Sequence, residues 1–481
     1  MKRLLLRASL PLALIIILCF CMSFALADTQ SSLKGVIDQA LLDPVLAHGI
    51  QGVLIESLKD GRVIYDKNSD LLIMPASNMK ILTSAASLDL LGPDYKMTTS
   101  LYISGKRTNG ILKGDVILVG RGDPVFKYEH LQEMAKKIKA LGIKTIEGSV
   151  IGDDTWFDGI PLGGGWSWDY LSDYYAAEIS GLNLNENVVE VWVKPGRKVG
   201  APALAKVEPS TSYMTIENTC TTSPAGSAKS VLVFRRYGKN VISVSGTVPL
   251  DYKPEGPEDV VTMQYPTVYT CQKFIEMLRH EGVTVKGRAV RGKKPEGAEL
   301  VMAHDSPPMS EMIKLLLKPS DNLIAECLFR SLGAKLKGKG SSSAAEEAEL
   351  DFLKKIGADD TAIAIADGSG LSRYDGISPM NMVVILKYMH DHKNFKAYYD
   401  ALPIAGVDGT LRRRMKGTSA EGNVHAKTGY IGRVRCLSGY VTTKSGEPLV
   451  FSIMLNNHLC KSSDADALID KIVTALAELD G

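Results

Sequence analysis

The sequence predicts an α/β fold in which one domain is interrupted by a long, mainly β insertion. The chain has 481 residues, which is more than a single ordinary domain core accommodates. Both ends of the chain combine helical periodicity with short apolar runs. Residues 96–299 differ, because short alternating runs there are separated by turns rich in Gly, Pro and Asn. An α/β domain split by this middle segment is the simplest arrangement that explains both sequence patterns.

The first expected elements are a hairpin and a buried helix. Residues 51–56 and 62–65 are apolar runs on either side of Asp60-Gly61, a dipeptide typical of two-residue hairpin turns. A helix is expected over residues 75–91, because proline is favoured in a first helical turn and a Gly-Pro pair follows its end.

Helical periodicity becomes rare in the middle of the chain and returns after residue 300. One helix is expected near residues 129–141. The last helix has one apolar face, which we expect to pack on a sheet rather than on a membrane. The C-terminal part is predicted to contain helices over 309–317, 323–332 and 464–478, strands over 436–443 and 448–456, and a flexible loop over 336–345.

Residues 1–27 have the pattern of a secretory signal peptide. Lys2, Arg3 and Arg7 precede an apolar run over residues 10–26, and a small-x-small cleavage pattern ends before Asp28. The alternative is a retained membrane anchor, since about 17 apolar residues are barely enough to span a bilayer. We therefore expect an exported protein, located in the periplasm or elsewhere outside the cytoplasm and at most loosely associated with the membrane. No apolar run after the leader is long enough for a further membrane span.

Charge and composition exclude several classes of function. The formal charge of +2 becomes −1 when the three basic leader residues are removed, so nucleic-acid binding is not expected. The eight histidines include no His-Glu-x-x-His motif, and His390-Asp391-His392 is typical of a polar helix end. Neither a metal site nor an organic cofactor is therefore predicted.

Five cysteines follow the leader. An exported chain can form disulfides, but an odd number leaves at least one thiol without an internal partner. A Cys220–Cys271 pair and isolated buried thiols are both compatible with the spacing. The five are Cys220, Cys271, Cys327, Cys436 and Cys460.

Three short motifs occur in order along the chain: Ser77-x-x-Lys80, Ser320-Asp321-Asn322 and Lys427-Thr428-Gly429. Each is common by chance, and decoys exist at Ser31-x-x-Lys34 and Lys444-Ser445-Gly446. Context separates them, because Ser31 lies outside any apolar helix and the second decoy lies at an expected hairpin tip. Ser77 instead opens an apolar helix, and Lys80 lies one turn later on the same face.

This spacing suits a serine nucleophile and a lysine base. The Ser77 hydroxyl is a weak nucleophile until a base removes its proton. Lys80 can act as that base only when neutral, so its pKa must fall by about 3 units from its reference value of about 10.4. Burial and a second cation such as Lys427 would both lower it.

The other two motifs supply the remaining groups. Lys427 is expected to hold a terminal carboxylate of the substrate, and Thr428 to add a hydroxyl. Gly429 would let the substrate approach the strand backbone. Ser320 is expected to relay a proton to the leaving amine, and Asn322 to orient Lys80 and the substrate amide. Taken singly, each motif is better explained as a helix cap, a turn or a surface charge, and it is the ordered set in these contexts that favours catalysis.

The motif set resembles the low-molecular-mass class C penicillin-binding proteins, the D-alanyl-D-alanine carboxypeptidase/endopeptidase family. The resemblance implies a penicillin-recognising serine transpeptidase-like domain, an antiparallel sheet with helices on both faces, over 28–95 and 300–481. It also implies two smaller, mainly β domains, over 96–120 with 200–299 and over 121–199. The stretches that carry it are 75–80, 120–124, 306–311, 320–326, 367–373 and 426–429.

The resemblance also implies roles for residues outside the motifs. Backbone N–H groups of Ser77 and Tyr430 would form the oxyanion hole. A pocket for a cationic substrate side chain would involve Arg373, Asp169 and Tyr175, with Trp166 or Trp168 nearby.

The function expected from this resemblance is cleavage of D-Ala-D-Ala-type bonds in peptidoglycan stem peptides and cross-links, with covalent binding of β-lactam inhibitors. Two alternatives remain open at the level of sequence. A β-lactamase would need a base for rapid deacylation, and none is recognisable. A non-catalytic envelope protein would not need reactive residue types at every motif position.

Overall fold

A computed structural model describes residues 33–480 of the chain. Its first layer is a five-stranded antiparallel sheet in the order β2-β1-β24-β23-β22, which joins strands from both ends of the chain. The expected hairpin and the two expected C-terminal strands are all in this sheet. The strands are β1 (Ile50–Ser57), β2 (Val63–Lys67), β22 (His425–Ile431), β23 (Val434–Thr442) and β24 (Pro448–Asn456).

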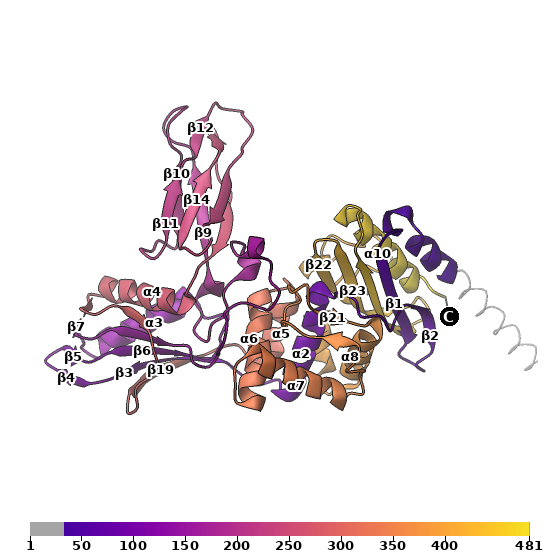
Figure 1. Ribbon diagram of the computed structural model, residues 1–481, viewed down its shortest axis with the longest axis horizontal. Helices are drawn as coiled ribbons and strands as arrows, with labels where there is room; N and C mark the ends of the chain where they lie inside the picture. The colour runs from indigo at the N-terminus through magenta and orange to yellow at the C-terminus, as the bar shows by residue number, and fades with distance from the viewer. Residues whose placement is uncertain (1–32, 481) are drawn as a thin grey trace, which may run out of the picture.

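Helices cover both faces of this sheet, as Figure 1 shows for α10 and α8. On one face, residues 33–41 and α10 (Ser462–Ala477) pack on alternate residues of β24, among them Phe451 and Ile453. On the other face, Val450 and Met454 of the same strand pack on helices that include α2 and α8. Because successive strand residues point to opposite faces, a strand covered on both sides is buried along almost its whole length.

Helices of this domain account for most of the central part of Figure 1. Three of these helices, α2, α5 and α6, were expected from the sequence, and the three further helices α7, α8 and α9 pack around them. The helices are α2 (Met79–Leu90), α5 (Met309–Leu317), α6 (Asn322–Leu332), α7 (Ser342–Lys355), α8 (Pro379–Asp391) and α9 (Phe395–Ala401). The predicted α/β fold with an antiparallel sheet between helices is therefore confirmed.

The insertion leaves and re-enters this domain through two paired strands, β3 (Thr98–Ile103) and β19 (Glu299–Asp305). They belong to a sheet of order β18-β8-β6-β3-β19. Helices α3 (Tyr128–Ala140) and α4 (Pro266–His280) pack on this unit. A neighbouring sheet has the order β17-β7-β5-β4. The other strands of these sheets are β4 (Lys106–Thr108), β5 (Ile111–Lys113), β6 (Val116–Gly120), β7 (Thr145–Ile146), β8 (Val150–Asp153), β17 (Thr284–Val285) and β18 (Ala289–Arg291).

A second inserted unit projects from the first (Figure 1). It consists of three small sheets whose strands all lie between residues 188 and 262. The strands are β9 (Val188–Lys194), β10 (Leu204–Glu208), β11 (Thr215–Asn218), β12 (Thr221–Ser223), β13 (Leu232–Arg235), β14 (Val241–Ser245), β15 (Thr247–Pro249) and β16 (Asp259–Thr262).

Strand pairing does not follow the domain ranges expected within the insertion. Strands β7 and β8 lie in the range 121–199, but they pair with strands of the range 96–120, and β6 and β8 are parallel. Two parallel strands need a crossover connection between them, and α3 lies in that connection for β6 and β8. This crossover keeps residues 121–153 with the first inserted unit. We propose that this unit comprises residues 96–187 and 263–305, and the projecting unit residues 188–262.

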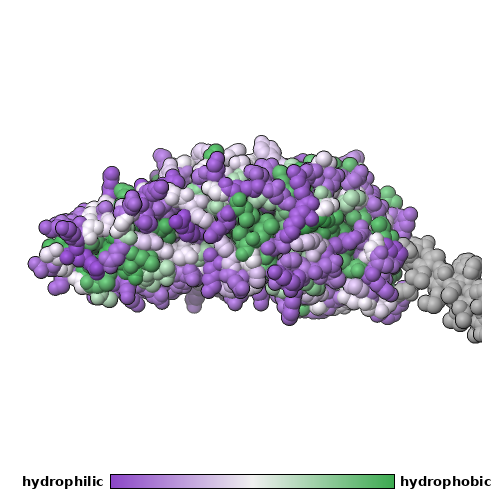
Figure 2. Space-filling view, turned by 90° about the horizontal axis from the view of Figure 1, so that it is seen from below, coloured by the Kyte–Doolittle hydropathy of each residue, from purple (hydrophilic) through white to green (hydrophobic). Residues whose placement is uncertain are grey.

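Two further expectations concern cysteines and the membrane. The five cysteines among the described residues are free thiols, and Cys220 and Cys271 do not form a disulfide. Within residues 33–480 we find no helix with the length and apolar character needed to cross a bilayer. The predicted signal peptide, residues 1–27, lies outside the described residues. On the face shown in Figure 2, hydrophobic residues form separate groups among hydrophilic ones.

Candidate active site

Ser77 lies in a single 3₁₀ turn, Ala76–Asn78, that leads directly into α2. The turn is strained, because Ala76 has a φ of 46°, a conformation that residues with a side chain rarely adopt. The turn is fixed to the sheet by Asn78, whose amide donates a hydrogen bond of 2.7 Å to the Ser438 hydroxyl. The hydroxyl of Ser77 is thus presented at the start of a helix that is anchored to the central sheet.

Lys80 is completely buried and makes three hydrogen bonds through its Nζ. One goes to Ser77 Oγ at 2.9 Å, as the three-residue spacing predicts. The other two go to Asn322 Oδ1 and to the backbone oxygen of Ser369, each at 2.6 Å. The first and second motifs are therefore joined through this one amine.

The predicted fall in the pKa of Lys80 occurs. Burial lowers the pKa to about 8, although the carboxylates of Asp367, Asp321 and Glu326 act in the opposite direction. Lys427, the second cation expected to lower this pKa, is not among the groups that shift it. Instead, burial and the Lys80 ammonium hold the pKa of Lys427 well below its ordinary value. Burial thus favours the neutral form of both amines.

The second motif is shaped by the start of α6. The Asp321 carboxylate accepts a hydrogen bond of 2.8 Å from Ile324 N and so caps the helix. Asn322 is then the first helical residue, and its Nδ2 donates to the backbone oxygen of Tyr175 at 2.7 Å. Ser320 has a φ of 66° and points its hydroxyl at Lys427, whose Nζ lies 2.8 Å away.

The third motif lies on the edge strand β22. Lys427 is completely buried, and Thr428 Oγ1 lies 2.8 Å from Thr410 Oγ1. Gly429 has a packing role that the sequence did not suggest. A Cβ at this position would lie 2.4 Å from the backbone oxygen of Pro75, so the absent side chain lets β22 approach the turn that carries Ser77.

A cavity of about 470 Å³ lies where the three motifs meet. Its walls include the nucleophile candidate, residues of the second and third motifs, and an aromatic group from the insertion. The lining residues are Ser77, Tyr170, Tyr174, Tyr175, Pro319, Ser320, Asn322, Gly370, Leu371, Thr410, Thr428, Tyr430, Ile431 and Gly432. A hydroxyl, a buried amine that contacts it, and a cleft beside them form a complete nucleophile–base pair.

A sequence profile described as D-Ala-D-Ala carboxypeptidase 3 (S13) matches residues 33–479. The chain belongs to this carboxypeptidase family. It is 35% identical over 477 residues to a D-alanyl-D-alanine carboxypeptidase of an Actinomadura species, covering 95% of this chain and 87% of the relative. It is 28% identical to the D-alanyl-D-alanine carboxypeptidase DacB of Haemophilus influenzae, covering 85% of each chain.

The solved structures agree with the family. The crystal structure of penicillin binding protein 4 from Haemophilus influenzae superposes with a TM-score of 0.81 at 26% identity, covering 91% of this chain and 97% of the other. The same protein in complex with a novel β-lactam gives a TM-score of 0.75 at 25% identity and the same coverage. The resemblance predicted from the motifs and the predicted fold are both confirmed.

The residues expected to bind the substrate side chain are only partly brought to the cleft. Tyr175 lines it, and Arg373 lies at its rim with Nη2 3.3 Å from the backbone oxygen of Gly432. Asp169 is exposed, accepts a hydrogen bond from Ser167 and is not among the lining residues. Its neighbour Tyr170 lines the cleft instead.

The two tryptophans considered near this pocket differ sharply. Trp168 is 75% exposed. Trp166 packs against the catalytic domain, and its Nε1 donates a hydrogen bond of 2.7 Å to Asp367 Oδ2. Neither this contact nor the one between Thr410 and Thr428 had a signal in the sequence, because the partners are far apart along the chain.

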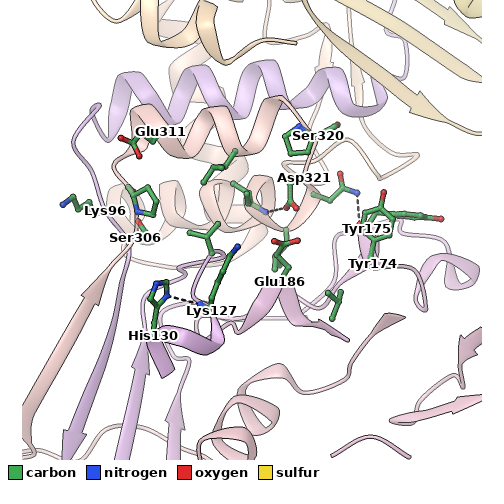
Figure 3. Close-up of a pocket in the computed structure, with 18 of the residues that line it drawn as sticks. Lys96, Lys127, His130, Tyr174, Tyr175, Glu186, Ser306, Glu311, Ser320 and Asp321 are labelled. Carbon is green, nitrogen blue, oxygen red and sulfur yellow. Dashed lines mark hydrogen bonds between the residues drawn. The ribbon is translucent and has the colours of Figure 1, made fainter. Parts of the chain in front are cut away.

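A second cavity, of about 790 Å³, adjoins the cleft (Figure 3). Tyr174, Tyr175, Pro319, Ser320 and Asn322 line both spaces. Figure 3 shows side chains from the insertion entering this space opposite the second motif, and they carry both signs of charge. The acidic and basic residues among its lining, histidines included, are Lys96, Lys127, His130, Glu186, His304, Asp305, Glu311 and Asp321.

Proposed function

We propose that the chain is a serine-type DD-peptidase that cleaves D-Ala-D-Ala-type bonds in peptidoglycan stem peptides through an acyl-enzyme on Ser77. Penicillin would acylate the same hydroxyl. The observation that carries this proposal is the contact between the Ser77 hydroxyl and the buried amine of Lys80. Membership of the carboxypeptidase family supports the substrate class.

The hydrogen bonds of Lys80 determine where its lone pair points. Asn322 Oδ1 and Ser369 O are carbonyl oxygens, which accept hydrogen bonds and cannot donate them. A neutral amine keeps its two N–H groups on these two acceptors, so its lone pair must face Ser77 Oγ. Lys80 can then take the serine proton as Oγ attacks the carbonyl carbon of the scissile bond.

The second and third motifs would complete the reaction. Lys427 and Thr428 would hold the terminal carboxylate of the substrate, and backbone N–H groups of Ser77 and Tyr430 would stabilise the oxyanion. As the C–N bond breaks, the Ser320 hydroxyl would deliver a proton to the leaving amine and recover one from Lys427, which lies 2.8 Å away. After the leaving group departs, the proton that Lys80 took from Ser77 would pass back to Lys427, so that Lys80 is neutral again. Water would then attack the ester carbonyl carbon and give a proton to Lys80, which returns it to the Ser77 oxygen as the ester C–O bond breaks.

We also propose that the enzyme acts on cross-linked stems as an endopeptidase. A cross-linked substrate carries a second peptide that must leave the catalytic cleft. The larger cavity adjoins the cleft through Ser320 and Asn322 and has room for several residues. Lys127 and Glu186 provide charges of both signs there, which suits the amine and carboxylate groups of stem peptides.

The proposed location of the protein is extracytoplasmic. The leader pattern of residues 1–27 and a substrate found in the cell wall support this. Mass spectrometry of the mature protein identifies its first residue. The signal-peptide prediction expects cleavage after Ala27.

The decisive experiment compares the natural protein with Ser77→Ala. The natural protein should bind fluorescent penicillin covalently and release D-Ala from a pentapeptide, and the variant should do neither while keeping its melting temperature. A folded variant that is still labelled would refute the role of Ser77. Rapid turnover of the β-lactam would favour a β-lactamase. A natural protein without labelling or D-Ala release would favour a non-catalytic envelope protein.

A further inference from the structure

The loop of residues 367–372 lies against both members of the nucleophile–base pair. Its Ser369 backbone oxygen accepts a hydrogen bond of 2.6 Å from Lys80 Nζ. Its Gly370 packs on the turn before Ser77 so closely that a Cβ there would lie 1.8 Å from the backbone oxygen of Ala76. A displacement of this loop would therefore move the base and the nucleophile turn together.

A single carboxylate organises this loop. Asp367 is completely buried and accepts hydrogen bonds from the backbone N–H groups of Ser369 at 3.0 Å, Gly370 at 2.6 Å and Ser372 at 2.7 Å. Its second oxygen also accepts the 2.7 Å bond from Trp166 Nε1 of the insertion. Four donors on one buried carboxylate fix its position.

Two contacts from neighbouring helices hold the same loop. Glu326 of α6 accepts hydrogen bonds from Gly368 N at 3.1 Å and Ser369 N at 2.9 Å. Thr83 of α2 donates to the backbone oxygen of Gly368 at 2.8 Å. The carbonyl that meets Lys80 thus has a defined direction, set by groups that do not touch the cleft.

We propose that Asp367 is a positioning residue for Lys80, and that Trp166 connects the inserted unit to the base through it. The inference rests on the proposed function, because it gives Lys80 the role of base. Asp367 does not contact the cleft and acts through Ser369, whose backbone oxygen keeps the amine directed so that its lone pair meets Ser77.

The charge of Asp367 also acts on Lys80 directly. Among the groups around Lys80, it is the carboxylate that most strongly opposes the fall in the pKa of that amine caused by burial. Trp166 donates its N–H to this carboxylate and so offsets part of its negative potential. The other titratable groups that face Lys80 are Asp321 and Glu326 from α6 and its cap, Asp375 from the segment after the loop, and Lys427 from β22.

This arrangement predicts opposite effects of two substitutions. Asp367→Asn removes a negative charge and should lower the pKa of Lys80 by about one unit. Trp166→Phe removes the N–H donor but keeps the carboxylate, and should raise that pKa by about 0.3 unit. A defect in folding alone would not move the two values in opposite directions.

A matched control is Trp192→Phe. Trp192 also donates its indole N–H to a carboxylate, with 2.9 Å between its Nε1 and Glu190 Oε2, but both residues belong to β9 of the projecting unit. The substitution is the same as at Trp166 and lies outside the loop and the cleft. The pKa of Lys80 should be unchanged in this variant.

The pKa of Lys80 is measured by NMR of the full chain with ¹³Cε-labelled lysine, the signal being assigned with Lys80→Met. Penicillin acylation is followed across the same pH range. Shifts in opposite directions support the inference, and unshifted values refute it. If Asp367→Asn does not fold, Trp166→Phe decides by the same criterion. The titration of Lys80 needs no turnover. Absence of acylation in the natural protein would therefore refute the proposed function, while the pKa values of Lys80 in the variants would still test this inference.

Discussion

The motif cluster around Lys80 and the aromatic segment of residues 163–176 meet at the same cleft but are built differently. Lys80 and Lys427 are completely buried and are held by side chains from three separate elements. The aromatic segment consists of short 3₁₀ turns, and Trp168 and Tyr174 are largely exposed. In the proposed function, the first region would fix the positions of the reacting atoms, and the second would provide a surface for the remainder of the substrate.

The two regions should differ in how well they tolerate amino-acid substitutions. A buried amine with three hydrogen bonds leaves unsatisfied partners when it is removed, which is costly in a medium of low polarity. An exposed tyrosine or aspartate loses only a contact with solvent or substrate. Substitutions in the cluster should therefore affect catalysis far more than substitutions in the aromatic segment.

The largest effect is expected for Lys80→Met. The change keeps a long side chain but removes the base, so the rate of penicillin acylation should fall by about 10³-fold or more. The melting temperature is measured in parallel to separate this loss from unfolding. A fall of less than about tenfold would mean that another group takes the Ser77 proton.

A smaller but clear effect is expected for Gly429→Ala. The added Cβ would meet the Pro75 oxygen at 2.4 Å and push β22 away from the Ser77 turn. We expect a loss of about 1–3 kcal/mol in the free energy of unfolding and acylation slower by about 10-fold to 100-fold. Gly256→Ala, where no atom lies near the new Cβ and φ is not positive, is the control for an added methyl group.

Much of the cluster could be predicted from the sequence, because each motif is local. The spacing of Ser77 and Lys80 fixes their contact once the helix forms, and the helix is signalled by its own residues. Asp367 could not be found this way as a partner of Lys80. Its importance depends on a loop folding back against α2 and on Trp166 arriving from the insertion, which no local pattern records.

The fold shows the same limit. Helix α4 was missed because its first turn contains Thr267, Val268, Tyr269 and Thr270, which favour strands, and the helix is stabilised by packing in the core of the inserted unit. The Ser-rich stretch predicted as a flexible loop begins α7 instead. Ser341 caps that helix by accepting a hydrogen bond of 3.2 Å from Ala344 N.

A moderate, substrate-dependent effect is expected for Glu186→Gln in the larger cavity. Burial and the Asp321 carboxylate raise the pKa of Glu186, and Lys127 opposes them, so its charge is sensitive to a bound ligand. The KM for a cross-linked muropeptide dimer should rise by about fivefold, roughly 1 kcal/mol, with no change for a pentapeptide. Glu129→Gln, an exposed change of the same charge on α3, is the control. An equal rise in the KM for both substrates would contradict the binding of the second stem peptide in this cavity.

The smallest effect is expected for Asp169→Asn in the aromatic segment. The side chain is exposed and is not among those lining the cleft, so kcat/KM should change by less than about twofold. A rise in KM of more than about fivefold, seen only with stems that carry a cationic side chain, would instead place this carboxylate at the substrate.

The most direct test of the account is the pH dependence of penicillin acylation in the natural protein. Lys80 must be neutral to accept the Ser77 proton, and burial lowers its pKa to about 8. The acylation rate constant should therefore rise with pH through an apparent pKa of about 8 and then level off, and Lys80→Met should show no such step. A rate constant that stays flat, or falls, as pH rises through this range would contradict the role of Lys80 as the base.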